Sequence, residues 1–142
     1  MNDYVAEAET EIRATPAQVW TALTDPRQIK SFMFGTEVRT EWRQRSPITW
    51  SGEYQGKAYE DKGEIIEIEP ERRLVVTHFS PLTGQDDVPE NYHTLTYELS
   101  ERRGVTHLSL RQDKKASREE AEHSTGMWER LLASLKMVVE RG

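Results

Sequence analysis

The sequence contains no cysteine among its 142 residues, and it is poor in large aliphatic side chains. Without cysteine the chain has no disulfide framework, no thiolate metal site and no cysteine nucleophile. Leu, Ile, Val and Phe together make up only about one residue in five, close to the level below which chains tend to be disordered. The spacing of the apolar residues, rather than their number, must therefore indicate whether the chain folds.

Long apolar runs and an excess of positive charge are also missing. No stretch is long and apolar enough for a transmembrane helix, and residues 1–10, which are acidic, do not resemble a signal peptide. The formal net charge of -6 argues against nucleic-acid partners, because these select basic surfaces. We therefore expect a cytoplasmic protein without membrane insertion, and the length predicts one domain over residues 1–142.

Alternation and capping signals predict the elements near the N-terminus. Residues 4–13 alternate charged with small or apolar side chains, which indicates a strand with one solvated face. Residues 15–18 (Thr-Pro-Ala-Gln) supply an N-cap, a proline at the first helical position and a capping box for a short helix. Asp25-Pro26 interrupts this helix and begins a second one that ends near Gly35.

The remainder of the chain predicts a sheet and one long helix. Strand signals recur from Glu37 to Gln112, with a long loop at residues 80–91 and a hairpin at residues 101–104. Beyond the N-cap Ser117, apolar residues recur at three- and four-residue steps, typical of a helix of roughly 20–25 residues with one apolar stripe. Gly126 inside this helix either weakens it, or lets it approach the sheet or leave space for a ligand.

These elements together predict an α+β fold. The expected architecture is a curved antiparallel sheet of about six to seven strands wrapped around one long C-terminal helix, with two short helices after the first strand. A sheet that wraps around a helix does not close tightly at both ends. The gap between sheet and helix is therefore where we expect a cavity.

Four segments, in sequence order, carry a family resemblance: residues 15–26, Phe32-Met33-Phe34-Gly35, residues 63–74, and the stretch from Gly126 to Lys136. They resemble the START-like (SRPBCC) helix-grip superfamily, and more narrowly its branch of homologues of the activator of heat-shock-protein-90 ATPase. The superfamily includes lipid carriers, plant hormone receptors, aromatic cyclases and oxygenase domains. The resemblance therefore implies the fold more narrowly than the function.

Two of the four histidines are candidates for chemistry. By alternation, His78 shares a strand face with Leu74 and Val76, and His93 shares one with Leu95, so both are expected to face the cavity. The alternative is that each is a hydrogen-bonded wall residue without a catalytic task. The sequence contains no H-E-x-x-H motif, nucleophile elbow or nucleotide-binding fingerprint, so we expect neither a metal nor a cofactor.

Aromatic residues on the predicted inner faces indicate a binding site. Trp and Tyr combine an apolar body with a polar tip, and a few such anchors in an apolar cavity are typical of small-molecule pockets, although the same residues can simply fill a core. The expected ligand-binding residues are Phe32, Phe34, Trp42, Trp50, Tyr54, His78, His93, Tyr97, Met127 and Trp128.

We therefore expect a protein that binds a small amphipathic ligand, lipid-like or aromatic, between the sheet and the C-terminal helix, as a monomer or a homodimer. One alternative is an enzyme of cyclase or dehydratase type acting on a small polyketide or aromatic substrate. Its proton-handling candidates are His78, His93, Tyr54 and Tyr97. Another alternative is a protein-interaction module of co-chaperone type.

Overall fold

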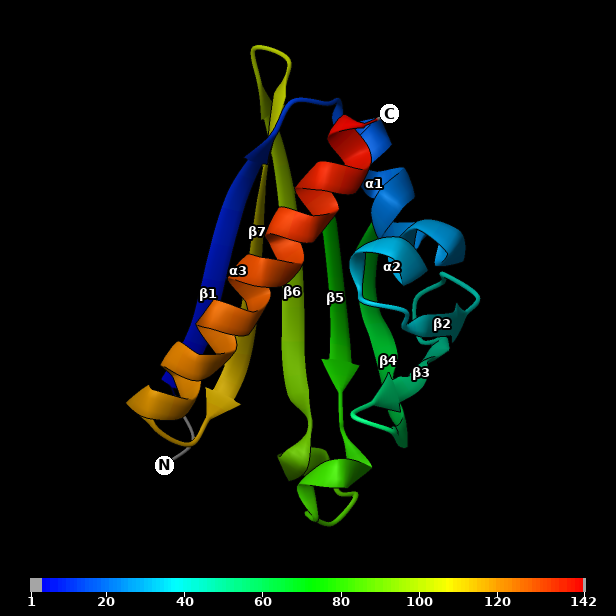
Figure 1. Ribbon diagram of the computed structural model, residues 1–142, viewed down its shortest axis with the longest axis vertical. Coiled ribbons are helices and arrows are strands. Elements are labelled where there is room, and N and C mark those ends of the chain that lie inside the picture. Colours follow the sequence, from blue (N-terminus) through cyan, green and yellow to red (C-terminus); the bar gives the residue numbers. More distant parts are fainter. Residues whose placement is uncertain (1–3, 142) are drawn as a thin grey trace.

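The computed structural model describes residues 4–141, which form a seven-stranded antiparallel sheet with a long helix lying diagonally across one face (Figure 1). The sheet order is β1-β7-β6-β5-β4-β3-β2. The predicted α+β helix-grip fold is confirmed. The elements are β1 (Tyr4–Ile12), α1 (Pro16–Thr24), α2 (Pro26–Phe32), β2 (Glu37–Thr40), β3 (Pro47–Tyr54), β4 (Lys57–Glu69), β5 (Arg73–His78), the short 3-10 helices η1 (Pro81–Thr83) and η2 (Pro89–Asn91), β6 (His93–Arg102), β7 (Val105–Lys115) and α3 (Arg118–Glu140).

The helix starts follow from local side-chain chemistry. Thr15 Oγ1 accepts a hydrogen bond from Gln18 N at 3.2 Å and Gln18 Oε1 accepts one from Thr15 N at 2.9 Å, which is the predicted capping box. Ser117 Oγ caps α3 by accepting from Glu120 N. The Glu120 carboxylate, however, accepts from Ala116 N rather than from the backbone of the cap. The capping box formed at Thr15 is therefore not repeated at Ser117, because the Glu120 carboxylate bonds to the residue before the N-cap.

The hairpins depend on backbone that only a few residues adopt readily. Gln55-Gly56 between β3 and β4 and Arg103-Gly104 between β6 and β7 all have positive φ. Two central residues of positive φ are typical of the type I′ turn, whose twist matches that of the strands. Glycine occupies the second position of both turns, where it carries no steric cost.

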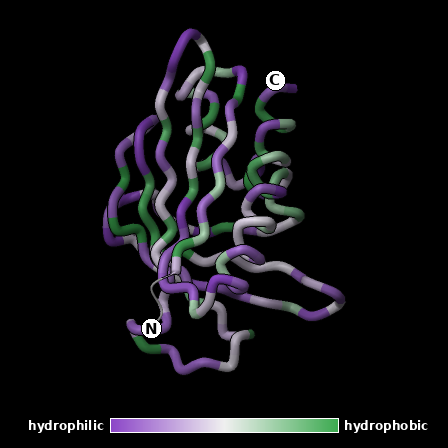
Figure 2. Tube along the Cα trace, turned by 90° about the vertical axis from the view of Figure 1, so that its left-hand side faces the viewer, coloured by the Kyte–Doolittle hydropathy of each residue, from purple (hydrophilic) through white to green (hydrophobic). Residues whose placement is uncertain are grey.

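The core lies between α3 and the inner face of the sheet, and α1 and α2 cover its other end. Leu132 and Leu135 of α3 are fully buried against Ile12 and Leu108 of the sheet and their neighbours. Figure 2 shows the alternation of apolar and polar residues along the strands that gives the sheet one face for the core and one for water. Burial of each large aliphatic side chain contributes about 2 kcal/mol, so this stripe stabilises α3 far more than intrinsic helix propensity does.

Strand β4 changes partner along its length at Gly63. Its N-terminal part, residues 57–64, pairs with β3, and its C-terminal part, residues 65–69, pairs with β5. At the change, Glu64 N donates to Thr77 Oγ1 at 2.9 Å in place of a backbone carbonyl. A Cβ atom on Gly63 would lie 1.7 Å from the Thr77 carbonyl oxygen. Only glycine fits here, because the two backbones approach so closely.

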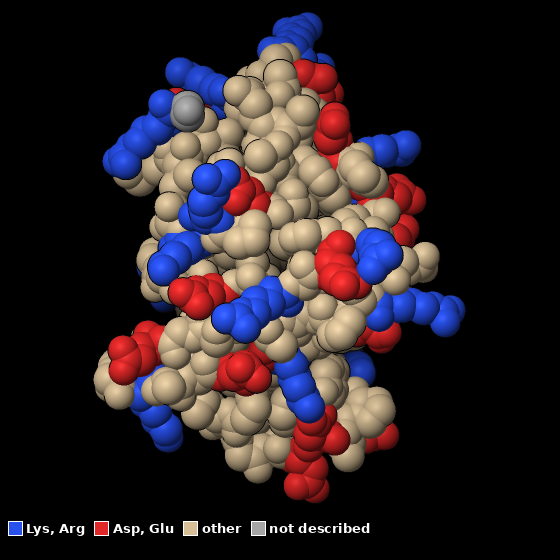
Figure 3. Space-filling view, turned by 90° about the vertical axis from the view of Figure 1, so that its right-hand side faces the viewer, with Lys and Arg blue, Asp and Glu red and all other residues tan. Residues whose placement is uncertain are grey.

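The surface mixes charges of both signs. On the face that carries α1, α2, β2 and β3, basic and acidic side chains alternate without a large patch of either sign (Figure 3). Within residues 4–141, no helix has the length and apolar character needed to cross a membrane.

The contact at Gly63 predicts a severe substitution. Gly63→Ala should lower the free energy of unfolding by about 3 kcal/mol or more, because the new methyl group can be accommodated only if the β4 and β5 backbones separate. Urea unfolding followed by far-ultraviolet circular dichroism measures this. A loss below about 1 kcal/mol would contradict the close approach.

Gly126→Ala is the matched control, and it should raise the free energy of unfolding rather than lower it. A Cβ there meets only Arg130 Nη1 at 3.9 Å, so Gly126 is not required for an approach of α3 to the sheet. The variant should gain about 1 kcal/mol from the higher helix propensity of alanine. A loss of stability in the same unfolding assay would show that this position is more crowded than the structure indicates.

Candidate ligand cavity

A cavity of about 720 Å³ lies between the sheet and α3. Its walls come from five places in the chain: the turn after α2, the β3–β4 hairpin, the end of β5 with the loop that follows, β6 and α3. The lining residues are Met33, Phe34, Thr36, Trp50, Glu53, Tyr54, Tyr59, Asp61, His78, Ser80, Leu82, Leu95, Tyr97, His123, Met127, Trp128, Arg130 and Leu131. Its size falls within the range of roughly 300–1,000 Å³ found for small-molecule sites.

Four large apolar side chains of this lining are exposed to solvent. They are Phe34, which is 72% exposed, Tyr54 at 67%, Leu82 at 50% and Met127 at 45%. Each comes from a different segment, and we call the four the apolar rim. Phe34 has a φ of 56°, an uncommon conformation for a bulky residue, and it follows the buried Phe32 by two positions. The backbone turn after α2 therefore carries this ring out of the core to the cavity edge.

Three residues separate the large cavity from a smaller one. Met33, Trp50 and Tyr97 line both, and the second cavity, of about 20 Å³, lies deeper among the side chains of α1, α2 and the sheet. Its volume is about that of one water molecule. The floor of the large cavity is thus a layer one side chain thick, with unfilled space on its far side.

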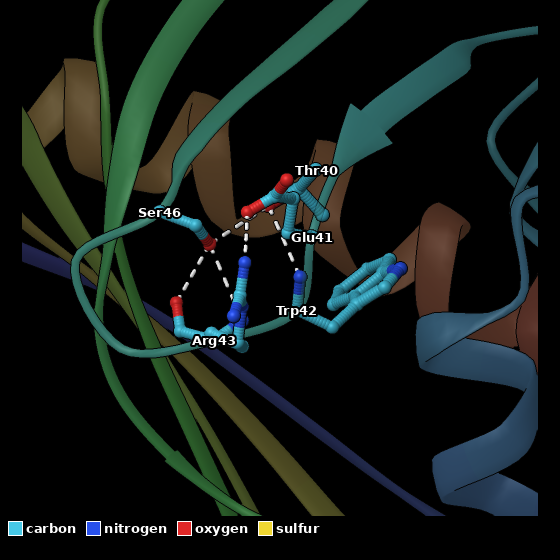
Figure 4. A network of polar contacts seen from close by, with 5 residues as sticks. All are labelled: Thr40, Glu41, Trp42, Arg43 and Ser46. Carbon is cyan, nitrogen blue, oxygen red and sulfur yellow. Dashed lines mark hydrogen bonds and ion pairs between the residues drawn. The ribbon is translucent and has the colours of Figure 1, made fainter.

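The far wall of the small cavity is positioned by a polar network between β2 and β3 (Figure 4). Ser46 Oγ donates to the Arg43 carbonyl at 2.6 Å and accepts from Arg43 N at 3.2 Å. Thr40 Oγ1, 3.2 Å from Ser46 Oγ, accepts from Trp42 N at 3.4 Å. Strand β2 ends at Thr40, so Trp42 does not continue its alternation as predicted. Its φ of 56° and this network instead direct the indole toward the core.

An ionisable pair lines the large cavity. His78 Nε2 lies 2.8 Å from Asp61 Oδ2, and both side chains are largely buried. The Trp50 ring packs edge-on to the His78 ring, with 5.1 Å between centroids. Asp61 is the direct cross-strand partner of Trp50, so β3, β4 and β5 bring the three side chains together. The second carboxylate oxygen, Asp61 Oδ1, is buried without a hydrogen-bond partner.

Two hydrogen bonds hold the cavity walls to the rest of the fold. Tyr59 donates from its hydroxyl to Thr36 Oγ1 at 2.7 Å, since Thr36 gives its own proton to the Met33 carbonyl. This ties the turn after α2 to β4. On the other side, Trp128 Nε1 donates to the buried Gln112 Oε1 at 2.9 Å and fixes α3 to β7. Aromatic side chains that find such partners form rigid walls.

The tyrosine and histidine on β6 differ in their surroundings. Burial raises the pKa of Tyr97 to about 12, so its phenol remains protonated at neutral pH. Burial also lowers the pKa of His93, against the opposing effect of its hydrogen bond to the Asp113 carbonyl and with a smaller lowering effect from Lys115. His93 Nδ1 is 2.7 Å from that carbonyl, which can only accept.

The structure brings together most of the residues expected from the sequence. The large cavity is lined by Phe34, Trp50, Tyr54, His78, Tyr97, Met127 and Trp128. Phe32 and Trp42 line the small cavity, and Phe32 lies in the core rather than at an entrance. His93 is the cross-strand partner of His78 but lines neither cavity.

Several lining residues were not expected from the sequence. Asp61 and Tyr59 lie on β4, whose inner face could be assigned only from its pairing with Trp50 and Gly52 on β3. His123 and Arg130 lie off the apolar stripe of α3, and both are exposed. Among residues 4–141, no group of three or more His, Asp or Glu side chains is placed to hold a metal ion.

Comparisons with known proteins identify a matching family and similar structures. The family model described as Activator of Hsp90 ATPase homolog 1-like protein matches residues 13–140. Among curated proteins, none matches the sequence. The solution structure of ChR145 from Cytophaga hutchinsonii is 41% identical, with a TM-score of 0.87 over 99% of this chain and 97% of that one.

Two more distant structures share the fold. One is the solution structure of the Aha1 dimer from Colwellia psychrerythraea, which is 17% identical with a TM-score of 0.74 over 96% of each chain. The other is the crystal structure of CalU16 from Micromonospora echinospora, 21% identical with a TM-score of 0.72 over 96% of this chain and 84% of that one.

The burial of His93 predicts how stability changes with pH. Its lowered pKa means that the unfolded chain binds a proton more readily, so the free energy of unfolding should fall as the pH drops from above 6.5 through the folded-state value. Urea unfolding at about pH 7.5 and about pH 5.5 should show a larger loss for the wild type than for His93→Gln. Equal losses would contradict this assignment, as would an NMR titration midpoint of His93 at or above 6.5.

Proposed function

The chain belongs to the family of Activator of Hsp90 ATPase homolog 1-like proteins, and from that premise we propose that it binds a small amphipathic or aromatic molecule in the cavity between the sheet and α3. The observation that carries the proposal is the coincidence of that cavity with the apolar rim. Exposed apolar side chains scattered singly need no explanation, but four from separate segments around one opening mark a binding surface.

The composition of the lining supports an amphipathic ligand. The aromatic and aliphatic walls of Trp50, Tyr54, Trp128 and Leu131 match an apolar body. The Asp61–His78 pair supplies a polar contact at one place in this lining. Glu53 and Arg130, which also line the cavity, are exposed and remain in contact with water, so they are suited to the solvated end of a ligand.

The walls are held in place without a ligand. The hydrogen bonds of Tyr59 to Thr36 and of Trp128 to Gln112 fix both sides of the opening to the sheet. A cavity that is already formed costs little further ordering on binding, so more of the contact energy appears as affinity. The preformed walls therefore support a small-molecule site, rather than a surface that becomes ordered only when a protein partner binds.

A charge placed on the apolar rim should test the proposal. Met127→Glu should weaken binding of the neutral fluorescent probe N-phenyl-1-naphthylamine about tenfold or more, because an ionised carboxylate against the probe must lose water. Met137→Glu is the matched control: Met137 is exposed (57%) on the same helix but does not line the cavity. Its affinity should equal that of the wild type.

Fluorescence titration of the three proteins gives the dissociation constants. Absence of saturable binding by the wild type would overturn the proposal. It would also be overturned if the probe bound Met127→Glu as tightly as it binds Met137→Glu, since binding would then occur elsewhere on the protein.

A further inference from the structure

The Asp61–His78 pair lies where a bound molecule would meet it. Both residues line the large cavity, and His78 Nε2 is 2.8 Å from Asp61 Oδ2. The other charged lining residues, Glu53, His123 and Arg130, are exposed. Asp61 and His78 are thus the one ionisable pair of this lining that is largely shielded from solvent, and in such surroundings a hydrogen bond discriminates strongly between ligands.

The contact with Asp61 determines which atom of His78 carries the proton. A carboxylate has no proton to give, so the hydrogen bond requires a proton on Nε2. In the neutral ring Nδ1 is then unprotonated and accepts hydrogen bonds. Nδ1 has no hydrogen-bond partner among residues 4–141, yet it is not among the buried polar atoms that are cut off from solvent. The cavity therefore offers an acceptor whose orientation is fixed by Asp61.

The ring also has a fixed aromatic neighbour. Trp50 packs edge-on to His78, and the lining also contains Phe34, Tyr54, Tyr59, Tyr97 and Trp128. A flat aromatic ligand packs against such rings with its face, and its substituents lie at its edge. A proton donor attached directly to the ring of such a ligand lies at that edge. An anionic group in the same place would instead meet the carboxylate of Asp61 and be repelled.

We propose that the Asp61–His78 pair selects aromatic ligands that carry a hydroxyl group on the ring, phenols or enols, by accepting their O–H hydrogen bond at His78 Nδ1. This inference rests on the proposed function, since it names the ligand class of the same cavity. It makes His78 the residue that determines specificity, and it gives Asp61 the task of positioning the imidazole and fixing its tautomer.

Three naphthalene probes and two variants test the inference. 2-Naphthol, 2-methoxynaphthalene and 2-naphthoate share an apolar body and differ in the group that meets His78. Their affinities are measured by displacement of N-phenyl-1-naphthylamine. His78→Phe keeps a ring and removes Nδ1. His107→Phe is the matched control, because His107 lies on the outer face of the sheet beside Glu9 and Glu11.

The wild type and His107→Phe should bind 2-naphthol about tenfold more tightly than 2-methoxynaphthalene, the effect of one hydrogen bond, and 2-naphthoate most weakly. His78→Phe should bind naphthol and its methyl ether with equal affinity, because no acceptor remains for the naphthol O–H. Equal affinity of the wild type for naphthol and ether, or a preference retained by His78→Phe, would overturn this inference while leaving the cavity as a binding site. Absence of binding of every probe would overturn the proposed function itself.

A measurement on the wild type keeps the inference testable if His78→Phe fails to fold. The ¹⁵N resonance of His78 Nδ1 should move upfield when 2-naphthol binds and should stay in place with 2-methoxynaphthalene, because only the naphthol donates a proton to that nitrogen. An identical response to the two probes would contradict the inference.

Discussion

The close approach of β4 to β5 at Gly63 is the constraint on which the cavity depends. A strand that paired with β5 over its whole length would continue the flat course of the sheet. Because Gly63 carries no side chain, β4 can lie close to the Thr77 carbonyl of β5 between the Lys62–Phe79 bridge and the paired residues 65–69, while residues 57–64 pair with β3. The β3–β4 hairpin then carries Trp50, Tyr54 and Asp61 into one wall of the cavity.

Helix α3 provides the other wall of the cavity. Its C-terminal half, with Leu132, Leu135 and Val139, is packed against the core. Its N-terminal half faces the cavity through His123, Met127 and Trp128. Gly126 lies in this N-terminal half, where a Cβ atom would meet only Arg130 Nη1, at 3.9 Å. The helix therefore stabilises the fold with one half and forms a binding surface with the other, and these tasks fall on separate residues.

Local patterns in the sequence were sufficient for the fold. The capping residues Thr15 and Ser117 and the apolar stripe of α3 act within a few residues of one another, so their spacing can be interpreted without knowing the rest of the structure. Alternation also placed Trp50, Tyr54 and His78 on the inner face.

The site could be predicted only in part. Alternation predicts on which face of a strand a side chain lies, but not whether that part of the strand borders the cavity. His78 and His93 are cross-strand partners, yet only His78 lines the cavity. Asp61 was missed because its pairing with Trp50 depends on the register between two strands. Trp42 was expected on the inner side of the sheet because of the alternation along β2. It does lie on that side, but beyond the end of β2, in a turn of positive φ.

The most direct test of the account is a map of where a neutral aromatic probe binds. In ¹H–¹⁵N spectra of the labelled protein titrated with N-phenyl-1-naphthylamine, the largest amide shifts should fall on the four separate segments around Phe34, Tyr54, Leu82 and Met127. A third cavity, of about 370 Å³, lies on the outer face of the sheet beside Arg73, Glu98 and Ser109. Shifts confined to that face would contradict the account, because the probe would then bind on the side of the sheet opposite to α3.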